Sequence, residues 1–301
     1  MDGLAAIHKP TIMEVVMPTF GIYFPLQIAR KGEIYKNPPS EHQYGPHDRQ
    51  NLDVFLPPTA SSDNKDAKLP CVFFVYGGGL AQGDKRIGPT DGAIYGNVGE
   101  YFSSRGFVAV LPDYRLYPAH NAAFPSGGED IGLAVDWVVK NLPQVDASKI
   151  FLIGNSAGGV HISTLLYSDE IPSSVPRHSI RGAIFAQVPF HFGIADSSRQ
   201  EILDGYYGAG RATERNPLEL RKKSKDNTDA AVLIAEFDPE DEILKPTRDF
   251  MSIFPIDGVK TPDMLPVVPV HNHISPFLSL GLGGREDAWA DSMVEWIKAR
   301  C

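Results

Sequence analysis

The chain has 301 residues, of which 43% are apolar and 22% charged, and its formal net charge is −9. The length suits one large folded domain, and the negative charge disfavours nucleic acid and anionic membrane surfaces as partners. We find no run of some 18 apolar residues that would predict a membrane span. The two cysteines, Cys71 and Cys301, show no disulfide pattern, so we expect a reducing, cytoplasmic location.

Residues 1 to about 30 carry apolar side chains without a strand period. Residues 51–56 then alternate apolar and polar side chains, which is typical of an antiparallel edge strand. Short apolar runs predict buried strands at residues 72–75, 107–111, 150–153, 182–186, 231–235 and 265–270. Helical spacing predicts helices at residues 130–139, 160–167 and 287–299. Strands that alternate with helices predict an α/β domain with a mostly parallel central sheet flanked by helices.

One segment interrupts this alternation between two expected strands. Residues 191–229 contain Gly-Tyr-Tyr-Gly and several charges, and so long an insertion is more often a lid than a linker. We therefore expect one domain over residues 1–301, in which residues 1–30 and 191–229 form a cap or lid over a pocket.

The pentapeptide G-x-S-x-G directly follows the expected strand at residues 150–153. It belongs to the run Gly154-Asn155-Ser156-Ala157-Gly158-Gly159, and a helical pattern follows it. A strand, a sharp turn and a helix hold a serine in a strained conformation with its Oγ exposed at the sheet edge. The free N–H groups of the helix N-terminus are then available to stabilise an oxyanion. This context predicts Ser156 as a nucleophile.

A serine nucleophile needs a base and an acid that orients the base, in the chain order Ser, acid, His. Asp238 stands at the carboxyl end of the expected strand 231–235, before a proline, and we prefer it over Glu236, Glu240 and Asp241. Catalytic residues gather at strand ends in open α/β sheets, whereas Glu240 and Asp241 suit the first turn of a following helix.

Two histidines follow the last expected strand. His273 lies further into the loop than His271, which abuts the strand, and we prefer His273 as the base. His271 then faces the interior or the pocket wall. His191 follows another strand and is a candidate pocket residue, although a structural role is the better expectation for it. His161 is expected to be a satisfied core histidine.

The loop after the strand at residues 72–75 reads Tyr76-Gly77-Gly78-Gly79-Leu80. Consecutive glycines let backbone N–H groups turn toward a ligand, so we expect Gly78, Gly79 and Ala157 to form an oxyanion hole. Tyr76 and Leu80 are candidate pocket residues. The loop lacks the third glycine of a dinucleotide site, a Walker loop is absent, and no cluster has metal-ligand spacing. We expect neither cofactor nor metal.

Taken together, these segments resemble the α/β-hydrolase fold family. The chain is most similar to its hormone-sensitive-lipase-like carboxylesterases and kynurenine-formamidase-like hydrolases, over roughly residues 50 to 300. The resemblance rests on Tyr76-Gly77-Gly78-Gly79, Asp113-Tyr114-Arg115-Leu116-Tyr117-Pro118, Gly154–Gly159, Glu236-Phe237-Asp238-Pro239 and His271-Asn272-His273. The family usually carries histidine in place of Tyr76, where it supports the oxyanion loop. The family's Asp-His-Phe context of the catalytic histidine matches Asn272-His273-Ile274 best.

The resemblance implies a serine hydrolase but not its substrate. We expect hydrolysis of a carboxylic ester of a small or medium apolar molecule. The same triad also suits an aryl formamide or a lactone. A third possibility is a protein of this fold without hydrolytic activity, either a ligand receptor or an enzyme of a biosynthetic rearrangement. Such proteins often lack one triad member, and this chain has candidates for all three.

Overall fold

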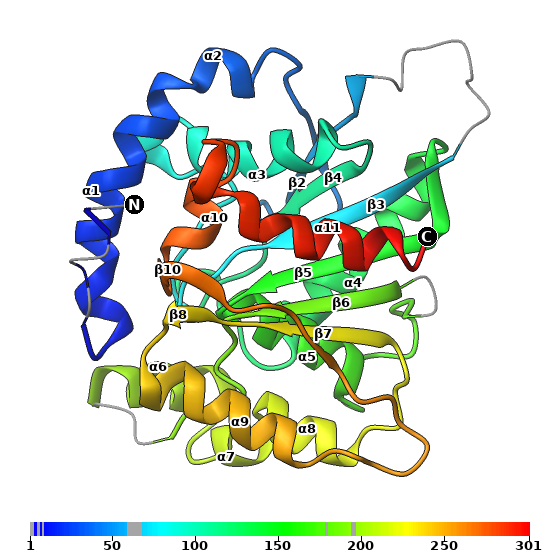
Figure 1. Cartoon of the computed structure of the whole chain (residues 1–301). Coiled ribbons are helices and arrows are strands. Elements are labelled where there is room, and N and C mark those ends of the chain that lie inside the picture. Colours follow the sequence, from blue (N-terminus) through cyan, green and yellow to red (C-terminus); the bar gives the residue numbers. More distant parts are fainter. Residues whose placement is uncertain (1–2, 5–6, 8, 59–67, 178–179, 194–196) are drawn as a thin grey trace.

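The computed structural model describes residues 3–4, 7, 9–58, 68–177, 180–193 and 197–301. Within these residues the strands form an eight-stranded sheet of order β1-β2-β4-β3-β5-β6-β7-β9 (Figure 1). Its members are β1 (Ser40–Gln43), β2 (Asn51–Phe55), β3 (Leu69–Val75), β4 (Val108–Pro112), β5 (Val145–Asn155), β6 (Ile180–Ala186), β7 (Asp229–Leu233) and β9 (Asp263–Met264). All neighbouring pairs from β4 to β9 are parallel, as the alternation of strands and helices predicted.

The antiparallel strand expected at residues 51–56 is β2, but it is not the edge of the sheet. It pairs antiparallel with β4 on one side and with β1 on the other. The sequence of β1 is Ser-Glu-His-Gln, which has no apolar pattern to predict a strand. The alternation of apolar and polar side chains in β2 does not match an alternation of buried and exposed residues. Asp53 is buried and accepts two hydrogen bonds from Arg86, both 2.7 Å long.

The last two expected strands divide between two sheets. The run at residues 231–235 is split into β7, in the main sheet, and β8 (Ala235–Phe237). The latter pairs with β10 (Val268–Asn272) in a separate two-stranded sheet. Pro266 and Pro269 have no N–H group to donate, which prevents a continuous ladder through residues 265–270. Figure 1 shows β8 and β10 near the carboxyl ends of the main strands.

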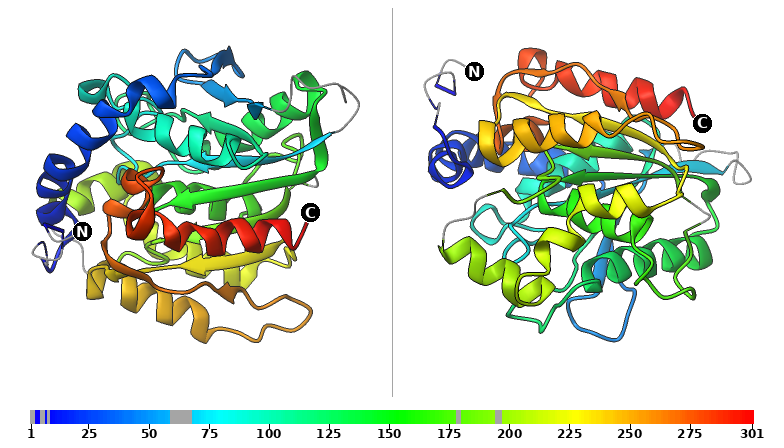
Figure 2. Two further views of the ribbon diagram at one scale, coloured as in Figure 1. Left: turned by 45° about the horizontal axis from the view of Figure 1, so that its top comes forward. Right: turned by 90° about the horizontal axis from the view of Figure 1, so that it is seen from below.

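Helices cover both faces of the main sheet (Figure 2). The helices α3 (Ala93–Ser103) and α11 (Asp291–Lys298) lie on one face, and α4 (Ser126–Asn141) and α5 (Ala157–Tyr167) lie on the other. The shorter α9 (Lys245–Ser252) and α10 (Ser275–Ser279) follow β8 and β10. The helix expected at residues 287–299 begins four residues later than predicted, because residues 288–290 form a single 3₁₀ turn.

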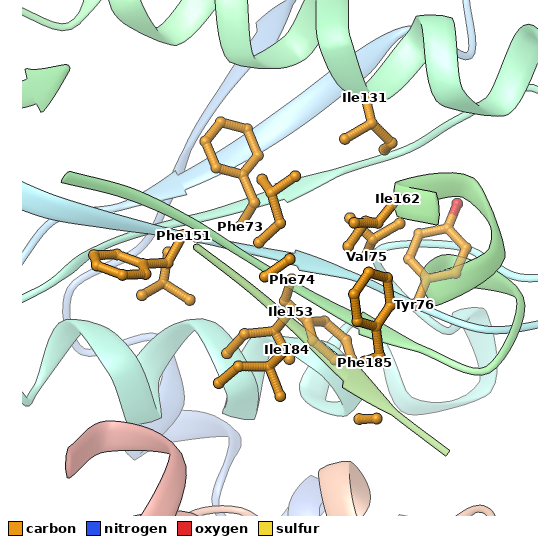
Figure 3. Packing of buried hydrophobic residues seen from close by; sticks show 14 of the residues in the cluster. Phe73, Phe74, Val75, Tyr76, Ile131, Phe151, Ile153, Ile162, Ile184 and Phe185 are labelled. Atoms are coloured by element: carbon orange, nitrogen blue, oxygen red, sulfur yellow. The ribbon is translucent and has the colours of Figure 1, made fainter. Parts of the chain in front are cut away.

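The core fills the two layers between the sheet and its helices (Figure 3). Phe73 lies on the side of Ile131 from α4, whereas the neighbouring Phe74 packs against Phe277, with ring centroids 4.7 Å apart. Phe151 of β5 meets Trp296 of α11. Side chains of this kind each stabilise the fold by about 1.5–3 kcal/mol when fully buried, so the central strands are a rigid base for the residues at their ends.

The two segments expected to form a cap are helical, and one helix of each lies at the carboxyl ends of the strands. Figure 1 shows α1 (Ile12–Ala29) at the end of the sheet toward which β5 points, with α6 (Ser197–Tyr207) nearby. The short helices α2 (Lys31–Ile34), α7 (Ala212–Arg215) and α8 (Pro217–Lys223) complete these segments. Gln27 holds α1 in place by donating hydrogen bonds to the carbonyls of Leu278 and Leu280, at 2.7 and 3.0 Å.

The helix α1 corrects the expectation that no apolar run of 18 residues is present. Among the described residues, it is the one helix that is long and apolar enough to cross a membrane. Only 22% of this span is buried, and Met13 and Met17 are 75% and 72% exposed. A core helix of a soluble protein or a signal sequence also meets both criteria. Pro18 and Pro25 lie inside the helix and obscure the pattern, because proline usually ends a helix.

Candidate active site

Ser156 lies in the sharp turn between β5 and α5. Its backbone has φ 51° and ψ −120°, a strained conformation for a residue with a side chain. Its N–H donates a 2.9 Å hydrogen bond to the carbonyl of Ala186, at the end of β6. The residues on both sides are buried, whereas Ser156 is partly exposed. The turn therefore presents one hydroxyl at the sheet edge, as the strand–turn–helix pattern predicts.

The glycines around Ser156 allow the helix to approach the strands closely. A Cβ atom on Gly154 would lie 2.5 Å from the Cα atom of Gly159, and one on Gly158 would lie 2.0 Å from the carbonyl oxygen of Val75. Both distances are shorter than real contacts. Larger residues would push α5 away from β3 and β5, and the turn would lose its shape.

His273 follows β10 and bridges the serine to an acid. Its Nε2 lies 3.0 Å from Ser156 Oγ, and its Nδ1 lies 3.0 Å from Oδ1 of Asp238. The loop is fixed by Asn272, whose side-chain oxygen accepts hydrogen bonds from the N–H groups of Ile274 and Ser275. The imidazole is 2% exposed, so water competes little for these contacts.

Asp238 follows β8 and is buried with its oxygens occupied. The Oδ2 atom accepts a 2.7 Å hydrogen bond from the N–H of Ala235. The Oδ1 atom faces His273 and also accepts a 2.9 Å bond from Nε2 of Gln187. A carboxylate is an acceptor only, and these donors fix both of its oxygens. The arrangement suits a group that orients an imidazole.

The glycine loop after β3 passes beside Ser156. A Cβ atom on Gly77 would lie 3.0 Å from Ser156 Cβ. Gly78 and Gly79 are exposed and have φ of 133° and 62°, and a Cβ on Gly78 would lie 2.0 Å from the carbonyl oxygen of Gln82. Ala157 is the first residue of α5, where backbone N–H groups have no partner within the helix. No hydrogen bond occupies these three N–H groups within the described residues.

Comparison with known proteins identifies relatives of this chain. A family model described as BD-FAE matches residues 52–173. A probable isoprenylcysteine α-carbonyl methylesterase of Arabidopsis thaliana is 28% identical over 154 residues, which are 50% of this chain and 33% of the relative. Carboxylesterase 20 of the same plant is 31% identical over 163 residues, 50% of this chain and 46% of the relative. The match thus spans between a third and half of the length of these relatives.

Solved structures extend the likeness to most of the chain. An esterase of Thermogutta terrifontis has 21% sequence identity and a TM-score of 0.62, with 87% of this chain and 91% of that chain covered. Esterase B of Lactobacillus rhamnosis has 18% identity and a TM-score of 0.69, with 95% of each chain covered. The chain has the α/β-hydrolase fold. Several of the matched relatives are named carboxylesterases, the class that the sequence motifs also indicate.

The competing acids do not contact His273 in this structure. Glu236 is exposed on β8 and accepts a 2.6 Å hydrogen bond from the N–H of Val270. Glu240 is exposed and pairs with Arg248. Asp241 is exposed in the helical turn that follows Pro239.

The second histidine of the loop turns away from Ser156. His271 is fully buried, and its Nδ1 lies 2.8 Å from Oγ of Ser275. Burial lowers the pKa of His271 to about 4, so the ring is neutral at neutral pH. We expected His271 in the interior or at the pocket wall, and it lies in the interior.

The other candidate pocket residues are not exposed to an open pocket. Tyr76 is fully buried behind the glycine loop, where its ring stacks on those of Tyr95 and Tyr114. Leu80 is 3% exposed, and its carbonyl accepts a hydrogen bond from Tyr117. Both residues support the glycine loop from behind.

The remaining histidines have contacts of their own. His191 is partly exposed, and its Nε2 lies 2.9 Å from Asp249 Oδ2 on α9. His161 is buried, as expected, but it is only partly satisfied. The hydroxyl of Tyr206 lies 3.5 Å from its Nδ1, whereas its Nε2 has no hydrogen-bond partner among the described residues.

Sequence reasoning missed two residues that contact this site. Gln187 donates to Asp238, and Thr19 of α1 accepts a 2.9 Å hydrogen bond from the side chain of Asn272, next to His273. Neither lies in a motif of the family resemblance, and both are brought to the site by the fold. The contact from Thr19 joins α1 directly to the loop of His273.

Proposed function

We propose that this protein is a serine hydrolase that cleaves carboxylic esters of small or medium apolar molecules through an acyl-enzyme. The observation that carries the proposal is the position of His273, with its two ring nitrogens 3.0 Å from Ser156 Oγ and 3.0 Å from Asp238 Oδ1. An alcohol is a weak nucleophile at neutral pH, and a base in hydrogen-bond contact makes it reactive. The carboxylesterase relatives support the same class of reaction.

The first half-reaction forms an ester bond to the enzyme. Ser156 Oγ attacks the substrate carbonyl carbon while Nε2 of His273 takes the hydroxyl proton. Asp238 accepts the hydrogen bond from Nδ1 and stabilises the imidazolium that forms. The tetrahedral intermediate collapses, the bond to the leaving alcohol breaks, and His273 returns its proton to that alcohol.

The second half-reaction releases the acid. Water gives a proton to His273 and attacks the acyl-enzyme, and Ser156 leaves with the proton restored. In both halves the negative oxygen needs hydrogen-bond donors that are already in place. We assign this task to the N–H groups of Gly78, Gly79 and Ala157, which bind no other acceptor within the described residues.

The surroundings of the triad favour an apolar substrate. Ile274 directly follows His273 and belongs to a cluster of apolar side chains between α1, α3 and α10. Phe20 and Phe24 of α1 are partly buried members of this cluster, with rings 4.4 Å apart. Apolar groups of a bound molecule gain free energy in such surroundings, at about 25 cal/mol per Å² removed from water.

Covalent labelling tests the proposed nucleophile. A fluorophosphonate probe should label the wild-type protein on Ser156 and should leave Ser156→Ala unlabelled. The variant should lose kcat by roughly 10⁴-fold or more, because the triad acts as a unit. A label on another residue, or activity of Ser156→Ala at a tenth of wild type, would exclude this nucleophile.

A substrate panel tests the bond that is cleaved. We expect hydrolysis of p-nitrophenyl esters, and chain lengths from acetate upward will report the size of the acyl site. N-formylkynurenine and an aryl lactone are the comparison substrates. A higher kcat/KM on either would assign the triad to formamide or lactone hydrolysis, and labelling without turnover of any substrate would favour a non-hydrolytic protein. The cytoplasmic location stays a prediction.

A further inference from the structure

Gln187 occupies an unusual position directly after β6. It is fully buried, although glutamine is mostly exposed in folded proteins, and its backbone has φ 56°. The left-handed region costs a residue with a side chain roughly 1–2 kcal/mol, and glycine would adopt it freely. A buried amide at a strained position calls for a specific reason.

The side chain of Gln187 contacts the three segments that carry the triad. Its Nε2 donates to Oδ1 of Asp238 at 2.9 Å and to the carbonyl oxygen of Asn272 at 3.3 Å. Its Oε1 accepts a 3.3 Å hydrogen bond from Nδ2 of Asn155. Asn155 precedes Ser156, and Asn272 precedes His273. One amide group therefore joins the nucleophile turn, the acid and the histidine loop.

The contact with Asp238 is placed to affect the base. The same oxygen, Oδ1, accepts from Gln187 and faces Nδ1 of His273. A side-chain amide has two N–H groups in a fixed plane, so the bonds to Asp238 and Asn272 together fix where this oxygen lies. The position of Oδ1 in turn determines the orientation of the imidazole toward Ser156.

The backbone of the same segment is tied to the nucleophile turn. The N–H of Gln187 donates a 2.7 Å hydrogen bond to the carbonyl of Leu233, at the end of β7. The preceding carbonyl, that of Ala186, accepts the N–H of Ser156 at 2.9 Å. The end of β6 thus holds Ser156 by its main chain, while the Gln187 side chain holds the acid and the histidine loop.

We propose that Gln187 is a positioning residue of the catalytic triad, which sets the alignment of Asp238 and His273 on Ser156. This inference rests on the proposed hydrolase function. It assigns no chemistry to Gln187 itself, since the amide acts through the carboxylate and the two loops.

Two substitutions separate positioning from a structural role. Gln187→Met keeps most of the side-chain length and removes the hydrogen bonds. Gln187→Gly removes the side chain and also removes the strain of the positive φ, which partly offsets the stability lost with the packing. The matched control is Gln50→Met. Gln50 is 3% exposed and also donates to a buried carboxylate, Oδ1 of Asp130, at 2.7 Å, but it contacts no triad residue.

We expect both Gln187 variants to lower kcat on p-nitrophenyl butyrate by roughly 10- to 100-fold, with KM within about threefold of wild type. Such a split indicates lost alignment rather than lost binding. Gln50→Met should keep the wild-type kcat, even where its thermal stability falls as far as that of Gln187→Met. The rate of fluorophosphonate labelling of Ser156 should fall in parallel with kcat.

A measurement without substrate separates this inference from the proposed function. The proton between His273 Nδ1 and Asp238 should give a far-downfield proton NMR resonance, identified by its loss in His273→Ala. The resonance should shift or broaden in both Gln187 variants and stay unchanged in Gln50→Met. If wild type fails to turn over esters, the hydrolase proposal fails, and this resonance still decides the role of Gln187.

Two results would overturn the positioning role. One is kcat within threefold of wild type and an unshifted resonance in both Gln187 variants. The other is loss of folding in both variants while Gln50→Met folds, which would make Gln187 a structural residue.

Discussion

The hydroxyl of Tyr76 donates a 2.5 Å hydrogen bond to Oδ1 of Asp113, and both side chains are buried behind the loop of Gly78 and Gly79. Arg49 donates to the same hydroxyl at 2.7 Å and lies 3.1 Å from the same carboxylate oxygen. Tyr76 stands where related hydrolases usually carry histidine. Burial raises the pKa of Tyr76 well above its usual value, so the hydroxyl stays protonated and serves as a donor.

Removing this hydroxyl should weaken the support of the glycine loop. Tyr76→Phe takes one acceptor away from Arg49 and one donor away from Asp113 Oδ1, which keeps the N–H of Lys85 at 2.8 Å. We expect the free energy of unfolding to fall by about 1–3 kcal/mol, measured by urea denaturation. We also expect kcat to fall more than KM rises, because the loop carries the proposed oxyanion donors.

The control for this variant is Tyr207→Phe. Tyr207 is also buried, but its hydroxyl has no hydrogen-bond partner among the described residues. Its removal should leave the stability unchanged within about 0.5 kcal/mol or raise it. Equal losses in the two variants would show that the bond to Asp113 does not support the loop.

The parts of the site that the sequence predicts are those with local causes. Ser156 could be placed because a strand, three glycines and a helix are contiguous around it. Asp238 and His273 could be placed because parallel strands end at one edge of the sheet, so residues after β8 and β10 meet there. Local patterns also predict the central strands from β3 to β7, although β7 ends two residues before its predicted end.

The parts that sequence reasoning missed depend on contacts between distant segments. Gln187 belongs to no motif, and only the fold brings it to Asp238, 51 positions away. The helix α1 contains two prolines, and its inward positions include Thr19 and Gln27, whose polar groups bond to the histidine loop and α10. An inward stripe with polar members is the reverse of the usual amphipathic pattern, so periodicity gave no signal.

The two histidines of the loop should differ sharply when they are replaced. His273→Ala should lower kcat by roughly 10⁴-fold or more, because it removes the base. His271→Ala should keep kcat within about tenfold, since His271 bonds to Ser275 and not to the triad, and its cost should appear in stability. Steady-state kinetics and thermal unfolding of both variants provide the test. A reversed order of the two losses in kcat would assign the base to His271.

Replacing one acceptor oxygen of Asp238 should lower the activity strongly. In Asp238→Asn an N–H₂ group replaces one of two oxygens that accept hydrogen bonds from Ala235, Gln187 and His273. With the amide nitrogen in the place of Oδ1, it meets the donors of Gln187 and His273, and the imidazole loses its orienting acceptor. With the nitrogen in the place of Oδ2, it meets the N–H of Ala235, and the remaining neutral oxygen stabilises an imidazolium less than a carboxylate does. We expect kcat to fall by roughly 10⁴-fold with KM nearly unchanged. Activity within tenfold of wild type would mean that another acid orients His273.

The stability of the protein should depend on pH through His161. Burial lowers the pKa of His161 to about 3, against about 6.5 in an unfolded chain. The unfolded state therefore binds the proton first as the pH falls. The stability that depends on the neutral ring is fully present above about pH 6.5 and is lost progressively toward about pH 3. Between about pH 8 and about pH 5, the free energy of unfolding should fall by about 2 kcal/mol for this reason.

The substitution His161→Gln removes this titration and keeps a polar side chain of similar size. Urea unfolding at about pH 8 and about pH 5 should show a wild-type loss of stability that exceeds the loss in the variant by about 2 kcal/mol. The control is His42→Gln in β1, where the ring is partly exposed and bonds to Ser40, and this variant should follow wild type. Equal losses in wild type and His161→Gln would show that the pKa of His161 is not lowered, which would mean that the ring is not buried in solution.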